Sequence, residues 1–510
     1  MSLWIWLLVL TILVVAFFVV FFTDYVFYWT DPVNCPPSEF PYQYDIKKYD
    51  EIFCDKPFEK TEKKILIVGC GFSGLSTSAA LTRYGIPFDV VEVNNQIGGN
   101  WFSGVYETVH IISSRKTTEM KDYPMPSSYP DFPSAKQMLE YFLDYCQHYR
   151  INERLALNTE VTKISENGDA YVVEFKQGDQ TFSRVYKGVI INNGHHWSRR
   201  MPKYENQEQF TGNIIHSKDY KEPSQLKGHR VLVIGAGNSG CDVAVEAARF
   251  GAESHISMRR GYFFLPRTLF GKPAVELIPA FLPVFIQQIM FKLILLVVTG
   301  IDYQKEYNLP NPDHNLFECH PTINSELLQF VKLGKIQPHR DILRFKGGKT
   351  IEFKNGEQVE IDLIVCCTGY NTSIPLLEPF VEKSEFGYPK LYTGIFVPHK
   401  KFLYYVGLGQ PRYGAGPLLT SSCDMLAKLI QLQDSMKYPV GDVLASVVGE
   451  KFPTPQKPHV SKDLLIDPHV AWKSSRFFSL FLIHLMPLFE KLSIMRKKLP
   501  LVQQEKRKQQ

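Results

Sequence analysis

Three glycines and one acidic residue form the clearest chemical pattern in this sequence. Gly69, Gly71 and Gly74 follow a short apolar run, and Glu92 stands near the end of the next such run. Glycines at this spacing permit a tight turn, a close approach of the backbone to a pyrophosphate, and close packing of a helix on a strand. Free N–H groups at the helix start bind phosphate, and the acid can accept hydrogen bonds from a ribose. The pattern predicts a dinucleotide site.

A second copy of the pattern begins at Gly235 and continues through Gly237 and Gly240. The strand predicted after it, residues 253–257, is followed by Arg259 and Arg260 instead of an acid. A carboxylate selects a free ribose hydroxyl, whereas a guanidinium can bind a 2′-phosphate through two hydrogen bonds. The second site is therefore expected to prefer NADPH over NADH.

Short buried strands and amphipathic helices must position these residues. Around the first motif the sequence predicts a strand at 65–68, a helix at 75–84 and a strand at 88–93. Residues 160–194 indicate a β-meander that returns to a buried strand. This order is typical of an α/β fold with two Rossmann-like dinucleotide-binding domains.

The composition narrows the class of protein. The chain has 510 residues and a net charge of +5, with no basic run near the glycine motifs, so nucleic acid is not an expected partner. Its nine cysteines include no CxxC pair and no metal-like spacing, which is typical of reduced thiols in a cytosol-facing enzyme. Only Cys35 and Cys54 stand where a disulfide is conceivable, and no metal site is expected.

Residues 3–22 are apolar and uncharged, and a helix of this length spans about 30 Å, the thickness of the hydrocarbon layer of a bilayer. They predict an uncleaved transmembrane anchor, with membrane lipid as a partner. Residues 277–301 are also apolar, but prolines and a lysine interrupt them, so a second full span ranks below a buried helix, a membrane-dipping segment or the wall of a substrate entry. Residues 477–489 are too short to span a membrane, and a basic tail follows them. Two interpretations are equally open: the segment and its tail lie on an anionic membrane face, or the tail is solvated.

Between the two glycine motifs, Phe210, Gly212, His216 and Tyr220 form a spaced fingerprint, FTGNIIHSKDY. With the GGNW stretch at 98–101 and the TGY stretch at 368–370, the chain over about residues 64–432 resembles the flavin-containing monooxygenases. The resemblance implies FAD and NADPH as cofactors, with the NADPH-binding domain inserted into the FAD-binding domain. Related Baeyer–Villiger enzymes end the fingerprint in Trp, so Tyr220 favours oxygenation of heteroatoms.

The resemblance also implies a role for each motif residue, with His216 in linking and orientation and not as a base. The implied FAD contacts are Gly69, Gly71, Phe72, Ser73, Gly74, Glu92, Gly99 and Trp101. The implied NADPH contacts are Gly235, Gly237, Asn238, Ser239, Gly240 and Arg259 or Arg260, and Thr368 and Gly369 are further cofactor contacts. The implied domains are an anchor at 1–30, a linker at 31–62, FAD-binding parts at 63–205 and 331–450, an NADPH-binding domain at 206–330, and a carboxyl-terminal segment at 451–510.

One departure from the family pattern bears on the chemistry. The family usually carries an asparagine that contacts flavin and substrate oxygen, and here that position falls on Ile112 or Ser113. Neither side chain supplies an amide. No other catalytic acid, base or nucleophile stands out in the sequence.

The resemblance implies hydride transfer from NADPH to FAD, formation of a C4a-hydroperoxide with O2, and attack by an amine nitrogen or sulfide sulfur of a small molecule. Three alternatives stay open: an NADPH oxidase that releases H2O2, a Baeyer–Villiger monooxygenase, and a membrane-tethered nucleotide-binding protein without turnover. Because NADPH is cytosolic, the catalytic body is expected to face the cytosol, on the endoplasmic reticulum in a eukaryote. The substrate and the oligomeric state stay undetermined.

Overall fold

The computed structural model of the chain describes residues 11, 14–15, 50–278, 282–450, 465–466 and 468–495. Apart from residues 11, 14 and 15, the predicted membrane anchor lies outside the described residues, as do most of the linker, the basic tail and Cys35. The described cysteines are all free.

The first glycine motif belongs to a five-stranded parallel sheet with β1 at its centre. All four residues of β1 are buried, as expected for a strand covered on both faces. The predicted strand at 65–68 is confirmed, and the predicted strand at 88–93 ends two residues earlier. In order across the sheet, the strands are β22 (Leu403–Tyr405), β7 (Gly188–Ile191), β1 (Ile65–Val68), β2 (Phe88–Val91) and β3 (Leu155–Ala156).

The second glycine motif belongs to a second five-stranded parallel sheet, and this sheet corrects the predicted domain boundary at 330/331. Two of its strands come from the stretch assigned to the second FAD-binding part, because neighbours in a parallel sheet are chosen by burial and not by order along the chain. The chain returns to the first sheet only at β22. The strands of the second sheet are β16 (Gln337–His339), β11 (Glu253–Ser257), β10 (Arg230–Ile234), β20 (Leu363–Cys366) and β9 (Asn213–His216).

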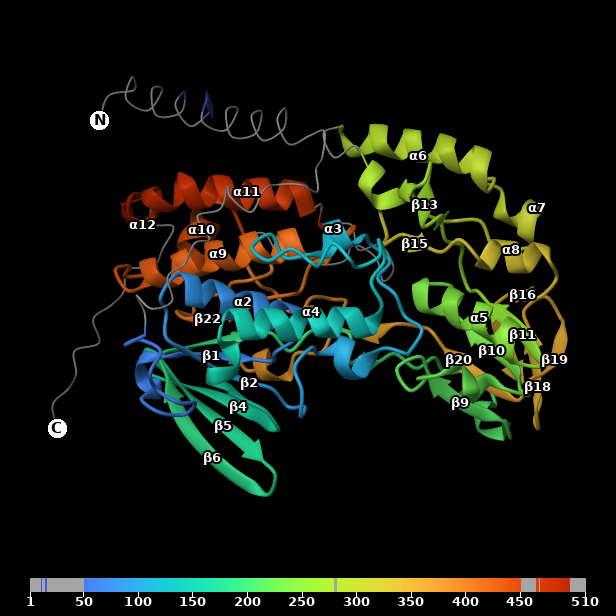
Figure 1. Cartoon of the computed structure of the whole chain (residues 1–510), viewed down its shortest axis with the longest axis horizontal. Coiled ribbons are helices and arrows are strands. Elements are labelled where there is room, and N and C mark those ends of the chain that lie inside the picture. The colour runs from blue at the N-terminus through green and yellow to red at the C-terminus, as the bar shows by residue number, and fades with distance from the viewer. Residues whose placement is uncertain are drawn as a thin grey trace.

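Two antiparallel sheets and four short strand pairs complete the β-structure of the described residues. The predicted meander is confirmed as a three-stranded sheet that projects below the first parallel sheet in Figure 1. The three-stranded sheets are β4 (Thr159–Asn167), β5 (Ala170–Gln177) and β6 (Gln180–Tyr186), and β17 (Ile342–Phe345), β18 (Thr350–Phe353) and β19 (Gln358–Glu360). The pairs are β12 (Phe264–Leu265) with β15 (Thr322–Ile323), β13 (Thr268–Leu269) with β14 (Lys272–Pro273), β8 (Ser198–Arg199) with β21 (Tyr370–Asn371), and β23 (Gln410–Pro411) with β24 (Leu465–Ile466).

Helices cover both parallel sheets, and the carboxyl-terminal helices pack over the first one (Figure 1). Each glycine motif leads directly into a helix, α2 or α5, so the glycine turn lies at the helix amino terminus. The helices are α2 (Phe72–Arg83), α3 (Arg115–Thr118), α4 (Ala135–His148), α5 (Asn238–Phe250), α6 (Val284–Val298), α7 (Tyr303–Tyr307), α8 (Leu327–Lys332), α9 (Gly416–Gln433), α10 (Val440–Val448), α11 (Pro468–Leu480) and α12 (Met486–Met495).

The apolar stretch 477–489 has protein partners in the fold. It runs from the end of α11 into α12, and Ile483 and Met486 are buried in the core of the first domain. Lys428 of α9 donates a hydrogen bond to the Ser479 carbonyl, 3.1 Å away. Packing on the first domain therefore accounts for part of the apolar character that suggested a membrane segment.

Candidate functional site

The first glycine turn is closed so tightly that a side chain does not fit. Gly69 has a φ of +98°, and a Cβ on Gly74 would lie 2.0 Å from the Gly69 carbonyl oxygen. A Cβ on Gly71 would stand 3.5 Å from the Gly99 Cα, so a second glycine-rich loop faces the turn. The backbone N–H groups at the start of α2 are thereby left open to a phosphate, as the sequence predicts.

Glu92 is held beside this turn at the carboxyl end of β2. Its Oε2 accepts a hydrogen bond from the Cys70 N–H at 2.8 Å, and its Oε1 accepts two from Asn94, at 2.7 and 3.0 Å. The side chain is almost completely buried. These three bonds fix the carboxylate at the place where a nucleotide ribose would meet the turn.

A cavity of about 790 Å³ begins at this turn and extends along the carboxyl edge of the first sheet. The residues predicted to contact FAD are brought together in its wall, apart from the packing glycine Gly74. The cavity wall also contains a second group of residues that the sequence did not predict, which follow β7 and β22 at the same edge. Wall residues from the predicted set are Gly69, Gly71, Phe72, Ser73, Glu92, Gly99 and Trp101, and those missed include Asn193, His195, His196 and Gly407.

Two polar atoms of the missed group have no hydrogen-bond partner within the described part of the chain. They are Oδ1 of Asn193 and Nε2 of His195, and both are buried. The other ring nitrogen of His195 donates to the Gly407 carbonyl at 2.9 Å, which leaves Nε2 as an acceptor. Burial lowers the pKa of His195, so the ring is neutral at physiological pH. Two unpaired acceptors in one cavity wall match a ligand that carries hydroxyl or imide donors.

His196 also faces the cavity and is neutral. Desolvation by the surrounding protein, followed by the neighbouring His195 and His320, lowers the pKa of its ring. The histidines at this end of the cavity therefore supply neutral polar contacts and no charge. Asn-Gly-His-His directly after a buried strand was the sequence signal that could have placed them at this edge.

The second glycine turn repeats the first. Gly235 has a φ of +99°, and a Cβ on Gly240 would lie 2.0 Å from the Gly235 carbonyl oxygen. The Gly235 N–H donates to the Ser257 carbonyl at 2.9 Å, which places the carboxyl end of β11 beside the turn. Arg259 and Arg260 follow this strand end in the chain. Both arginines thus stand at the edge where the sequence predicts a 2′-phosphate contact.

His216 of the fingerprint joins the second sheet to the TGY loop. Its Nδ1 accepts from the Lys218 N–H at 3.1 Å, so its Nε2 is the donor to the Gly369 carbonyl, 3.0 Å away. Burial lowers the pKa of this ring as well. A histidine with both nitrogens bonded to backbone supports the predicted linking role. Thr368 lies in the same loop and donates to the Arg200 carbonyl.

The remaining fingerprint residues are packing residues around the second parallel sheet. The Phe210 ring lies 5.3 Å from that of Phe345, and the fully buried Tyr220 donates its hydroxyl to the Glu246 carboxylate on α5. Burial raises the pKa of that carboxyl. A Cβ on Gly212 would lie 2.5 Å from the Asp362 carbonyl oxygen, which explains the glycine.

Neither residue at the family's asparagine position lines the cavity. Ile112 packs against the apolar cluster beneath α6, and the Ser113 hydroxyl is bonded to that of Thr118 at 2.6 Å. The missing amide is therefore not supplied there. Asn193 is an amide residue that does line the cavity, from the loop that follows β7.

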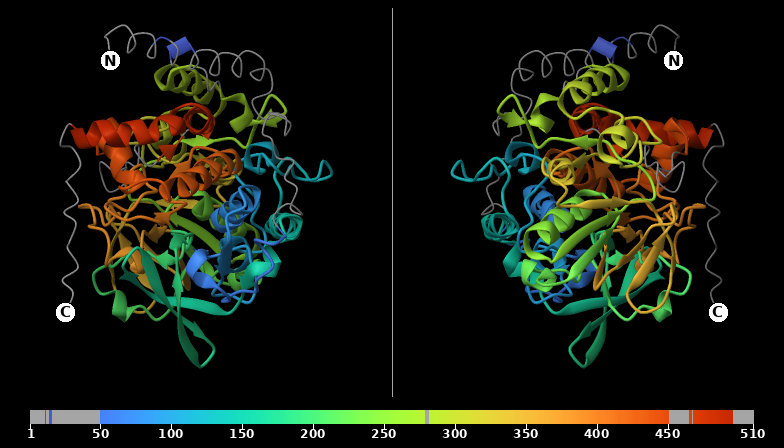
Figure 2. Two further views of the ribbon diagram at one scale, coloured as in Figure 1. Left: turned by 90° about the vertical axis from the view of Figure 1, so that its left-hand side faces the viewer. Right: turned by 90° about the vertical axis from the view of Figure 1, so that its right-hand side faces the viewer.

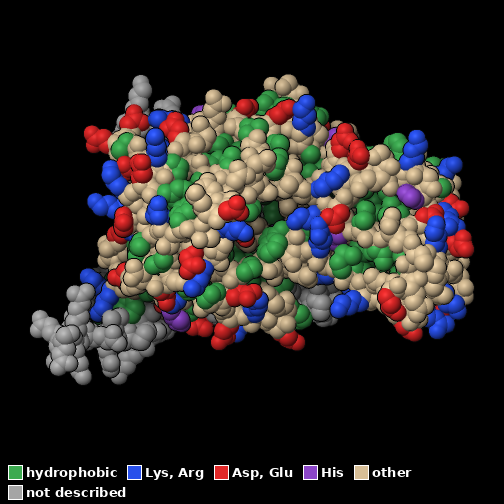
Figure 3. Space-filling model, turned by 90° about the horizontal axis from the view of Figure 1, so that it is seen from below, with side chains coloured by type: hydrophobic (Ala, Val, Ile, Leu, Met, Phe, Trp, Pro, Cys, Tyr) green, Lys and Arg blue, Asp and Glu red, His purple; other side chains and the backbone are tan. Residues whose placement is uncertain are grey.

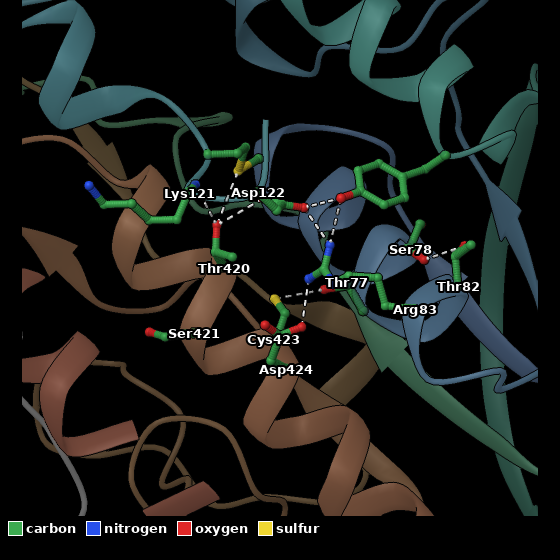
Figure 4. A network of polar contacts seen from close by, with 12 residues as sticks. Thr77, Ser78, Thr82, Arg83, Lys121, Asp122, Thr420, Ser421, Cys423 and Asp424 are labelled. Carbon is green, nitrogen blue, oxygen red and sulfur yellow. Dashed lines mark hydrogen bonds and ion pairs between the residues drawn. The ribbon is translucent and has the colours of Figure 1, made fainter. Parts of the chain in front are cut away.

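A buried ion-pair network fixes the carboxyl-terminal end of α2 (Figure 4). Arg83, at the end of α2, pairs with Asp122 and lies 2.6 Å from Asp424 of α9. Asp122 also accepts hydroxyl hydrogen bonds from Tyr145 of α4, at 2.9 Å, and from Tyr149 directly after α4, at 2.6 Å. These partners are far apart in the sequence, and no local pattern identified them.

Two parallel sheets, each with a glycine turn at a helix amino terminus, define a Rossmann-type α/β oxidoreductase that binds two dinucleotides. A family model described as flavin-binding monooxygenase-like matches residues 62–427. The chain therefore belongs to the flavin-binding monooxygenase-like family, and the predicted resemblance is confirmed.

Relatives and solved structures agree with this assignment. The chain is 28% identical over 343 residues to the probable indole-3-pyruvate monooxygenase YUCCA8 of Arabidopsis thaliana, covering 64% of this chain and 79% of the relative. It is 29% identical over 377 residues to human flavin-containing monooxygenase 5, covering 69% and 70%. A crystal structure of OTEMO in complex with FAD and NADP shares the fold, with a TM-score of 0.57 and 14% identity over 74% of this chain and 87% of that one.

The protein is thus a flavin-dependent monooxygenase with FAD and NADPH as cofactors, and it uses O2 and a small-molecule substrate. The residues present fit both cofactors. The turn at Gly69 and the fixed Glu92 suit FAD, and the unpaired acceptors of Asn193 and His195 suit its hydroxyl and imide donors. The turn at Gly235, with arginines beside it, suits NADPH.

Replacing His195 with phenylalanine is expected to weaken FAD binding without destabilising the protein that lacks FAD. The neutral hydrogen bond lost is worth about 0.5–1.5 kcal/mol, or roughly two- to tenfold in Kd. In the protein without FAD, removing the unpaired Nε2 relieves a desolvation cost, and this offsets the lost hydrogen bond from Nδ1 to the Gly407 carbonyl. Flavin titration and thermal unfolding of both forms measure the two effects. A drop in stability before FAD is added would show a purely structural role.

Replacing Arg259 or Arg260 with alanine is expected to raise KM for NADPH while leaving KM for NADH unchanged. A hydrogen bond to a charged phosphate contributes about 1.5–3 kcal/mol, which is tenfold or more. Steady-state kinetics with both nucleotides identifies the arginine that makes the contact. Arg249→Ala is the control. This exposed arginine lies at the end of α5 that is far from the glycine turn, and it pairs with Glu326. Equal increases for NADH and NADPH would contradict a 2′-phosphate contact.

Proposed function

We propose that the enzyme transfers one atom of O2 to a nitrogen or sulfur nucleophile of a small molecule. The other oxygen atom leaves as water, and NADPH with one proton supplies the two electrons. Tyr220 is the observation that carries this choice. It closes the fingerprint where Baeyer–Villiger enzymes carry tryptophan, and its hydroxyl is anchored to Glu246 of the NADPH-side helix α5.

The residues of the chain bind the two cofactors, orient them and exclude water from the site. FAD, when bound, supplies the electron transfer and the oxygen activation. The turn at Gly69 and Glu92 hold it, the turn at Gly235 holds NADPH, and His216 keeps the connection between the two sites fixed. Because His195 and His196 are neutral, neither ring acts as an imidazolium acid in the cavity.

Coupling measurements test the proposal. NADPH consumed, O2 consumed and H2O2 released are followed without substrate and then with a sulfide, a tertiary amine and a ketone. We expect sulfoxide or N-oxide to match NADPH consumption, with little peroxide. Ester from the ketone would overturn the proposal in favour of Baeyer–Villiger oxygenation. The ketone belongs in the assay because one relative is named for a keto acid.

NADPH oxidase activity is the second candidate, favoured by the missing amide. Ile112 and Ser113 both turn away from the cavity, so the position that usually supports the oxygenated flavin contributes nothing to it. Peroxide formation equal to NADPH consumption, whatever substrate is added, would establish this function. Asn193→Ala distinguishes the two: if Asn193 replaces the amide, this variant turns a coupled enzyme into a peroxide producer.

We also propose that residues 3–22 anchor the enzyme in a membrane with its body in the cytosol, on the endoplasmic reticulum in a eukaryotic cell. The length and apolar character of the stretch support this, together with the cytosolic source of NADPH. Protease treatment of sealed microsomes tests the topology, because a cytosolic body is digested and a lumenal one is protected.

A further inference from the structure

Helix α6 is amphipathic, but its glutamines face the protein and its exposed face is apolar. Its buried face carries Gln287, which is 1% exposed and donates to the Leu282 carbonyl at 2.8 Å. Gln288 donates to the Leu316 carbonyl at 2.7 Å. By contrast, Leu293 is 59% exposed and Val297 is 86% exposed. A surface helix in water normally places its polar residues outward, so this outer face is built for an apolar surrounding.

The exposed apolar residues of α6 form one continuous face. Phe285, Ile289, Leu293 and Val297 follow one another at intervals of four residues, which places them in a row on one side of the helix. Lys292 is the single charged residue of α6, and its amino group bonds to the Asn315 side chain at 3.2 Å. The remaining large exposed residues of the helix are Val284, Met290, Leu296 and Val298.

A neighbouring hairpin extends this face. The turn between β13 and β14 carries Phe270, which is 87% exposed, next to the exposed Lys272. Leu269 of the hairpin and Phe291 of α6 belong to the same buried cluster, so the two elements form one unit. An exposed aromatic ring beside a lysine is the combination that suits the boundary between lipid and water.

We propose that the outer face of α6, with the tip of the β13–β14 hairpin, inserts into the surface of a lipid bilayer. The short described part of the amino-terminal apolar stretch, drawn in blue, lies on the same side of the molecule as α6 (Figures 1 and 2). An anchor that enters the membrane there brings lipid to α6. The opposite side, seen in Figure 3, carries acidic and basic side chains scattered over its whole area.

The geometry indicates insertion and not a second span. Among the described residues, the helical stretch Val284–Tyr307 alone is long and apolar enough to cross a membrane. It is interrupted, however, between Val298 and Tyr303, and its second part carries Lys305 and Glu306. The 15 residues of α6 itself extend about 22 Å, less than the 30 Å or so of hydrocarbon. α6 therefore lies along the bilayer surface.

Photocrosslinking of the full chain in vesicles tests this inference. Benzoyl-phenylalanine replaces Leu293 or Val297, and the vesicles of phosphatidylcholine and phosphatidylserine carry alkyne-tagged acyl chains. The control replaces Leu343 of β17, an equally apolar residue that is 44% exposed. Flavin content per protein verifies that each variant is folded. We expect lipid adducts at 293 and 297 and none at 343.

The other outcomes overturn the proposal. An adduct with residues 1–30 would mean that the chain's own amino-terminal stretch covers α6, and an adduct with a second copy would make this face a contact between protomers. An adduct with another protein, or none at 293 and 297, would also exclude lipid. As a second readout, the tryptophan fluorescence that Phe270→Trp adds to that of the native tryptophans is expected to be quenched by brominated acyl chains, whereas the fluorescence that Leu343→Trp adds is not.

Discussion

The Gly74→Ala variant is expected to purify without FAD. The added Cβ would lie 2.0 Å from the Gly69 carbonyl oxygen, a contact with backbone that no side-chain rotation relieves. Overpacking of this kind costs about 1–3 kcal/mol or more, and here the movement displaces the turn that binds the pyrophosphate. We expect at least a tenfold loss of FAD affinity, since tenfold corresponds to about 1.4 kcal/mol. Visible flavin absorbance per protein measures it.

The matched control is Gly240→Ala, because its added Cβ meets the Gly235 carbonyl oxygen at the same 2.0 Å. This variant is expected to keep FAD but to lose reduction of the flavin by NADPH, measured by anaerobic stopped-flow. The assignment of the two sites would be wrong if Gly240→Ala lost the flavin while Gly74→Ala kept it.

Arg83→Met is expected to destabilise the first domain by about 3–5 kcal/mol, because it leaves two buried carboxylates, Asp122 and Asp424, without their cation. The loss also frees the carboxyl end of α2, so FAD is expected to dissociate at lower urea concentrations. Urea unfolding followed by circular dichroism and by flavin fluorescence measures both effects.

Arg249→Met is the control for Arg83→Met. Its ion pair with Glu326 is nearly half exposed, so the expected change is within about 1 kcal/mol. A similar loss of stability in both variants would mean that the Arg83 network contributes no more than a surface ion pair. The prediction also fails if Arg83→Met unfolds the protein while the flavin stays bound at unchanged urea concentrations.

The sequence predicted most of the local structure around the two nucleotide turns. The strand at 65–68 and the strand at 253–257 form as expected, and the helix predicted at 75–84 begins three residues earlier, inside the glycine turn. Turn, strand and helix depend on residues close together in the chain, so their patterns are visible without the fold. The family and both cofactors followed from the same motifs.

Local sequence patterns did not predict the order of strands in the two parallel sheets. β16 and β20 joined the second sheet and not the first. β20 is a fully buried apolar run that would suit either parallel sheet. β16 is the short polar segment Gln337–His339, which carries no apolar pattern that would assign it to a sheet. The predicted boundary at 330/331 was wrong for this reason. The cavity acceptors Asn193 and His195 were missed likewise, since their place depends on β7 lying beside β1.

By itself, the sequence determined that this chain builds two glycine turns for two dinucleotides, because backbone conformation near a glycine is a local property. Only the tertiary structure decided that Arg83 meets Asp424, that an asparagine from the loop after β7 and not the residues near 112 reaches the cavity, and that α6 turns its glutamines inward. Each of these depends on contacts between segments far apart in the chain. Their energies arise from burial, which exists only once the chain is folded.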